Sequence, residues 1–110
     1  MAGGTPKEND TFNALGHPLR REILRTMLAS AAEISPRELS GKLDEPLSAL
    51  SYHVRVLAEC DAVELVRTRQ IRGSTQHFYR AVVKEPWALA ALEASHARRR
   101  RRRRQGEEKG

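Results

Sequence analysis

The stretch that decides the fold runs from Ile34 to Cys60 and reads ISPRELSGKLDEPLSALSYHVRVLAEC. Ser35 is a natural N-cap, Pro36 suits the first helical position, and Glu38 can bond back to the backbone of the cap residue, which predicts a helix start. A short distance later Pro46 opens another helix, which we expect to end near residue 60. The pattern therefore predicts two helices joined by a tight turn.

The second helix of this pair has two unlike sides. Leu50, Val54 and Leu57 recur at helical spacing and predict a buried face, with His53 packed at its edge. The opposite side carries Ser48, Ser51, Tyr52 and Arg55. Such hydroxyl and guanidinium groups can bond to base edges and phosphates. An ordinary polar surface would look the same, so this face alone leaves both interpretations open.

Helical and strand patterns flank the pair. A first helix, which Asp10 can cap, is interrupted before Pro18, and a second apolar stripe of helical period follows it. Residues 63–69 and 75–82 are rich in Val, Thr, Phe and Tyr and predict a β-hairpin, and Pro86 opens a last helix. The predicted fold class is mainly α with a β-hairpin, in the winged helix-turn-helix arrangement.

The hairpin carries three arginines that can act on a nucleic acid, Arg67, Arg69 and Arg72. Cations beside the turn residue Gly73 can reach phosphates or a minor groove next to the helix pair, as a wing does. The alternative is a charged hairpin that faces solvent only.

Composition and charge limit the kinds of protein that this sequence can encode. The chain has 110 residues, 39% hydrophobic and 31% charged, which is room for a single globular domain. Most of the net charge of +6 comes from the arginines at 98–104, because residues 11–97 are nearly neutral. We expect a flexible N-terminus at 1–10, a DNA-binding domain at 11–97 and a frayed or disordered Arg-rich tail at 98–110. Non-specific phosphate contacts are expected from Arg98, Arg99, Arg100 and Arg101.

Several functions are disfavoured. Apolar runs are too short to cross a bilayer and the first residues lack a signal-peptide pattern, so we expect a cytoplasmic protein without membrane contact. The single cysteine, Cys60, cannot form an internal disulfide. Paired carboxylates, an activated nucleophile and a glycine-rich phosphate loop are missing from the sequence, so the chain is not expected to be an enzyme.

Four segments in order resemble the ArsR-type family of bacterial winged-helix transcriptional regulators: ALGHPLRREIL at 14–24, ELS at 38–40, LSYHVRVL at 50–57 and FYR at 78–80. The resemblance covers roughly residues 11–96. It implies a homodimer whose two recognition helices enter successive major grooves of a double-stranded operator, usually to repress a promoter. It also implies an association with the bacterial nucleoid and, in many relatives, a small-molecule inducer that releases the DNA. The dimer would form through the first and last helices, with Phe12, Leu15, Trp87, Leu89 and Leu92 in the interface.

This sequence departs from the metal-sensing relatives. Those members carry a cysteine pair near the recognition helix or aspartate and histidine ligands on the last helix, whereas this last helix offers only Glu93 and His96. We therefore expect no metal site and no cofactor. Two other functions stay open: a winged-helix module that binds another protein, and a basic protein that binds RNA or DNA non-specifically through its arginine tail.

Overall fold

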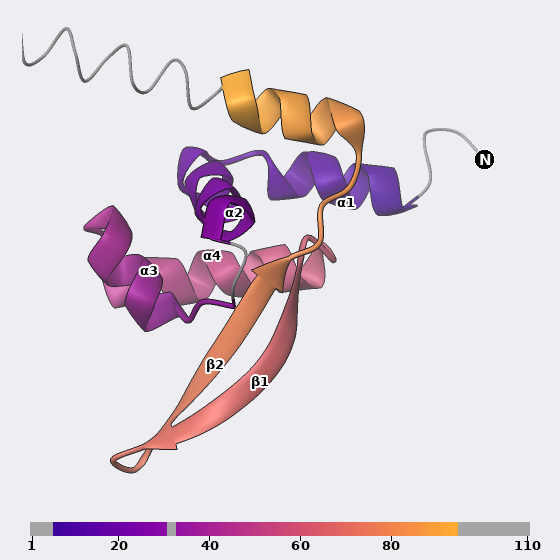
Figure 1. Cartoon of the computed structure of the whole chain (residues 1–110). Coiled ribbons are helices and arrows are strands. Elements are labelled where there is room, and N and C mark those ends of the chain that lie inside the picture. The colour runs from indigo at the N-terminus through magenta and orange to yellow at the C-terminus, as the bar shows by residue number, and fades with distance from the viewer. Residues whose placement is uncertain (1–5, 31–32, 95–110) are drawn as a thin grey trace, which may run out of the picture.

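Prolines mark the start of most helices in the computed structural model, which describes residues 6–30 and 33–94. The hairpin extends away from the helices, with its turn at the far end (Figure 1). The elements are α1 (Pro6–Ala14), α2 (Pro18–Ser30), α3 (Pro36–Leu43), α4 (Leu47–Glu59), β1 (Val63–Ile71), β2 (Ser74–Ala81) and a further helix over residues 86–94. This is the winged helix-turn-helix fold that the sequence predicts.

The first helix begins earlier than expected. α1 starts at Pro6, so Asp10 lies inside the helix and is not its cap, and residues 6–10 of the segment predicted to be flexible are helical. The physical reason is that proline suits the first turn of a helix, a signal that we used at Pro18 but not here. The rest of that predicted segment and the predicted tail at 98–110 lie outside the described residues.

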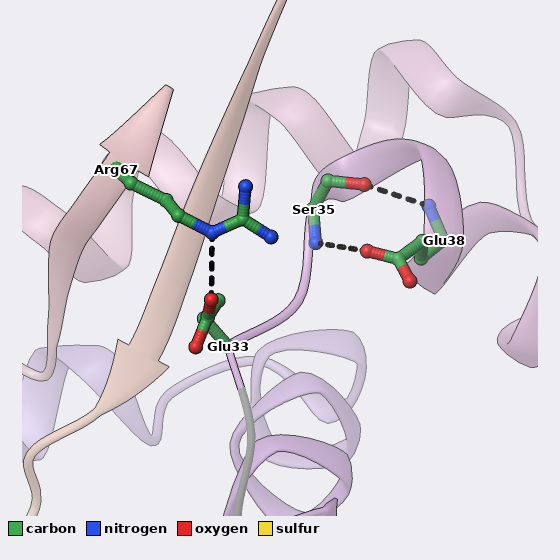
Figure 2. Close-up of polar contacts among 4 residues, drawn as sticks. All are labelled: Glu33, Ser35, Glu38 and Arg67. Atoms are coloured by element: carbon green, nitrogen blue, oxygen red, sulfur yellow. Dashed lines mark hydrogen bonds and ion pairs between the residues drawn. The ribbon is translucent and has the colours of Figure 1, made fainter. Parts of the chain in front are cut away.

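The predicted capping box at the start of α3 is confirmed (Figure 2). The Ser35 Oγ accepts a hydrogen bond from the Glu38 backbone N at 3.2 Å, and the Glu38 Oε1 accepts one from the Ser35 backbone N at 3.1 Å. α3 ends at Asp44, whose left-handed backbone (φ 54°) turns the chain toward Pro46 and α4. A side-chain cap therefore sets the start of the first helix of the pair, and a left-handed backbone conformation sets its end.

The hairpin is longer and its turn tighter than predicted. β1 and β2 pair antiparallel, and a two-residue turn of Arg72 and Gly73 joins them, with φ of 48° and 82°. Positive φ at both central positions is the geometry that matches the twist of paired strands. Ile34, just before α3, forms an isolated antiparallel bridge with Tyr79 of β2, which ties the hairpin to the helix-turn-helix pair.

A shared core holds these elements together. Its fully buried side chains are Ile23 and Leu24 from α2, Leu39 from α3, and Leu50, Val54 and Leu57 from α4, with Leu92 from the 86–94 helix. Leu15 also belongs to this core, so the side chains of two of the five residues expected in a dimer interface, Leu15 and Leu92, are buried within the single chain. Across residues 6–30 and 33–94, every helix is too short or too polar to cross a lipid bilayer.

Candidate nucleic-acid interface

α4 exposes the face that the sequence singled out. Ser48, Tyr52 and Arg55 are exposed and Ser51 is half-buried. The other side of the helix is buried, because Leu50, Val54 and Leu57 pack into the core. The orientation that the helical period predicts is therefore observed, while contacts between these side chains and DNA stay a prediction.

A groove separates this face from the hairpin. Its volume is about 360 Å³. Its walls are the start of α3 (Ser35, Pro36, Arg37), the outer side of α4 (Leu47, Ser51, Arg55, Ala58) and β2 (Ser74, Thr75, Gln76, His77, Tyr79). The structure thus brings two of the predicted α4 residues, Ser51 and Arg55, to the same groove as the second strand of the hairpin.

Most residues of this groove were not predicted as contacts, among them the polar residues Arg37, Thr75 and Gln76. Arg37 stands at the second position of α3, inside the segment that predicts the helix start, and was given no role of its own. Strand alternation would have placed Thr75 on the same face as His77 and Tyr79, but it gives no signal for Gln76, which is adjacent to Thr75 and alternates to the other face.

The three wing arginines have different surroundings. The Arg67 Nε donates to Glu33 Oε1 at 2.7 Å (Figure 2). Its guanidinium group lies over the Phe78 ring, 4.1 Å from the ring centroid. This hydrogen bond lowers the pKa of the Glu33 carboxyl. Arg69, opposite Gln76, and Arg72, in the turn, are both exposed. Arg67 therefore anchors the hairpin to the segment before α3, a role that the sequence analysis did not foresee.

An apolar patch lies at the opposite end of the molecule. Phe12 of α1 and Trp87 of the 86–94 helix stack with their ring centroids 4.5 Å apart, and the two helices lie side by side (Figure 1). Phe12 is 64% exposed, Trp87 38% and Leu89 37%. Of the five residues expected in a dimer interface, these three present apolar surface, whereas the side chains of Leu15 and Leu92 are buried.

The remaining predictions concern metal binding, Cys60 and the arginine tail. In the part of the chain that the structure describes, no three His, Cys, Asp or Glu side chains come close enough to hold a metal ion. Cys60 is buried, and burial raises the pKa of its thiol. His96 and the four tail arginines Arg98, Arg99, Arg100 and Arg101 lie outside the described residues.

An exposed helix face beside an antiparallel hairpin, on the second helix of a tight helix pair, defines a winged helix-turn-helix protein. A family model described as a helix-turn-helix domain matches residues 15–66. HlyU from Vibrio cholerae is a similar solved structure, with 28% sequence identity, a TM-score of 0.61 and coverage of 88% of this chain and 96% of that one. No curated protein matches the chain.

Two further structures share the fold. An ArsR family transcriptional regulator has 24% identity and a TM-score of 0.54, over 92% of this chain and 94% of its own. NolR from Sinorhizobium fredii has 22% identity and a TM-score of 0.56, over 86% of this chain and 92% of its own. Together these findings show that the chain contains a helix-turn-helix domain and shares the winged helix-turn-helix fold of these structures, one of which is described as an ArsR family transcriptional regulator.

Proposed function

We propose that the chain is a homodimeric repressor that binds a specific double-stranded operator in the bacterial cytoplasm. α4 would read the major groove and the hairpin would contact phosphate or the minor groove. The observation that carries the proposal is the outer face of α4: its polar side chains are exposed, its apolar side is locked in the core, and Ser51 and Arg55 share a groove with β2.

The dimensions and chemistry of α4 support a place in the major groove. The helix has 13 residues, which corresponds to about 20 Å at the usual rise per residue. A major groove about 12 Å wide admits such a helix. Arg55 can pair with a guanine edge, and Ser48 and Ser51 can bond to bases or phosphates, so the exposed face has groups for sequence readout.

The groove beside α4 supports the path of a DNA strand. Arg37 and Arg55 supply positive charge to its walls, and Ser51 and Thr75 supply hydroxyl donors. Guanidinium and hydroxyl groups are the side chains that most often bond to phosphate oxygens. We therefore place a segment of the sugar-phosphate backbone between α4 and the hairpin, with Arg69 and Arg72 reaching the DNA beyond it.

The apolar patch of Phe12, Trp87 and Leu89 supports the proposed dimer. Phe12, Trp87 and Leu89 leave apolar side chains exposed on two adjacent helices, and a second copy would bury them. A two-fold dimer would present two copies of α4 to half-sites about 34 Å apart. Leu89→Glu should give monomers in light scattering, whereas Leu28→Glu, at a similarly exposed leucine of α2, should leave the mass unchanged. A dimeric Leu89→Glu protein would refute this interface.

DNA binding is tested by selecting bound fragments from the host genome and titrating the selected site at stated salt. Arg55→Ala should weaken binding to that site by roughly 5- to 150-fold, the cost of losing one bidentate base contact. Lys84→Ala is the matched control, because Lys84 is an exposed cation on the connection after β2, away from the groove. Equal affinity of Arg55→Ala and parent would contradict the proposal.

A deletion separates the alternative functions. If removal of residues 98–110 abolishes binding while Arg55→Ala binds normally, the chain acts through its arginine tail as a non-specific nucleic-acid-binding protein. If no genomic fragment is selected at any salt concentration, the groove serves another partner, as in a winged-helix protein-interaction module.

A further inference from the structure

Arg20 of α2 joins three elements through one guanidinium group. Its Nε donates to the Ala14 carbonyl oxygen at 3.2 Å and its Nη2 to the Asn13 carbonyl oxygen at 3.0 Å, both at the end of α1. Its Nη1 lies 3.3 Å from the Nδ1 of His53, on α4. A single side chain thus connects the helix that carries Phe12 with the helix that carries Arg55.

The contact with Arg20 requires a neutral imidazole. A guanidinium group can only donate hydrogen bonds, so the His53 Nδ1 must accept, and the ring proton is assigned to Nε2. A protonated imidazole has no acceptor nitrogen. A proton on Nδ1 would therefore replace the hydrogen bond with an N–H group facing an Arg N–H group, and with two positive charges side by side.

A second histidine, His17, lies beside this contact. The His17 Nδ1 accepts a hydrogen bond from the Leu19 backbone N at 3.0 Å and so caps the first turn of α2. The His17 and His53 rings lie 4.3 Å apart between centroids. The cluster at the junction of α1, α2 and α4 thus brings two imidazole rings and the Arg20 guanidinium group together.

The surroundings of His53 oppose a positive charge. The side chain is only 9% exposed. Burial lowers its pKa from the usual 6.5, and the nearby His17 and Arg20 lower it further. These are the charged and titratable groups that act on it from the α1–α2 joint and from α2, while on its own helix the neighbouring Tyr52 ring meets it edge-on at 5.0 Å.

We propose that Arg20 is a positioning residue for α4, and that its hydrogen bond to His53 makes the placement of this helix, and with it DNA affinity, dependent on pH. The proposal rests on the proposed role of α4 in DNA readout. When His53 takes up a proton, α4 loses its hydrogen bond to Arg20 of α2, through which it is linked to the end of α1, and the fraction of chains with α4 correctly placed falls. Apparent affinity falls in proportion to that fraction.

The sign of the effect follows from the lowered pKa. The unfolded chain takes up this proton at about pH 6.5, before the folded chain does. The contribution of the neutral His53 is therefore complete above that pH, and it is lost progressively as the pH falls from there through the lowered pKa of the folded state. Binding should weaken in the same direction.

The first test measures affinity for the selected operator between pH 7.5 and 5.5 at constant ionic strength. His53→Gln keeps a side-chain oxygen that can accept from Arg20 but does not titrate. We expect the parent to lose affinity on acidification: the equilibrium between correctly placed and displaced α4 shifts by at most about tenfold for each unit of pKa difference between the two states, and affinity follows the correctly placed fraction. His53→Gln should show a markedly smaller loss, and His77→Gln, which removes an exposed histidine of β2, should not reduce the loss. An equal loss in parent and His53→Gln would overturn the proposal.

The second test needs no DNA and separates this inference from the proposed function. The thermal midpoint of the full chain is measured over the same pH range for the parent, His53→Gln and Arg20→Lys. The parent should lose more thermal stability on acidification than His53→Gln, and Arg20→Lys should show the smaller dependence as well, because an ammonium group cannot serve three acceptors in the same way. Identical pH profiles for parent and His53→Gln would refute the role of His53 even if the operator is bound. Failure to bind any operator would refute the proposed function. The comparison of thermal midpoints between parent and His53→Gln would still test the Arg20–His53 hydrogen bond.

Discussion

Replacing Ser35 with alanine removes the hydroxyl that caps the first helix of the pair. The Ser35 side chain accepts from the Glu38 backbone N at 3.2 Å, and Ser35 is only 1% exposed. Loss of an N-cap hydroxyl costs about 0.5–2 kcal/mol of stability. Because the site is buried, water cannot easily take the place of the hydroxyl, so we expect a cost of about 1.5 kcal/mol, within the range for an unsatisfied buried donor.

The assay is urea unfolding followed by circular dichroism. Ser35→Ala should lower the free energy of unfolding with little change in the m-value, because the surface exposed on unfolding stays the same. For a domain of this size the thermal midpoint should fall by about 6 °C. A free energy of unfolding that differs from the parent's by less than about 0.3 kcal/mol would refute the reasoning, because that difference is below the smallest expected cost of a lost cap.

Variants at Glu38 serve as controls. Glu38→Gln keeps an oxygen that accepts from the Ser35 backbone N, so it should cost less than Ser35→Ala, about 0.5 kcal/mol for the lost charge near the helix N-terminus. Glu38→Ala removes the second hydrogen bond of the box. The double variant Ser35→Ala/Glu38→Ala should cost less than the sum of the single variants, because each bond helps to form the turn that the other needs.

Other positions give further expectations. Leu39→Ala should lower the free energy of unfolding by about 2–5 kcal/mol, because the side chain is fully buried between the helices, and an unchanged denaturation midpoint would contradict this. Arg67→Ala should lower stability through the lost contacts with Glu33 and the Phe78 ring but leave the salt dependence of DNA binding unchanged. Arg69→Ala should leave stability unchanged. It should make the slope of log affinity against log salt concentration less steep by about 0.9 if Arg69 neutralises one phosphate. Iodoacetamide should modify Cys60 more slowly in the folded chain than in urea, because burial raises the pKa of the thiol and blocks the reagent; equal rates would refute this.

The sequence by itself determined the elements whose rules are local. The capping box at Ser35 and Glu38 spans a single helical turn, so residue types and spacing suffice to predict it. The two faces of α4 follow from its helical period, which separates Leu50, Val54 and Leu57 from the polar side chains between them. The family segments add the fold, because they occur in the right order over most of the chain.

The tertiary structure decided which side chains find their partners within the chain and which remain exposed. Arg67 looked like its neighbours in the hairpin, yet its partner Glu33 lies 34 positions away, before α3. Leu15 and Leu92 had the residue types of an interface, but packing within the single chain buries them. Arg20 and His53 meet across 33 positions, and the groove beside α4 needs β2 as its far wall. Periodicity shows which side of an element is apolar or charged, but the partner that meets that side depends on contacts between segments far apart in the sequence, which only the folded chain defines.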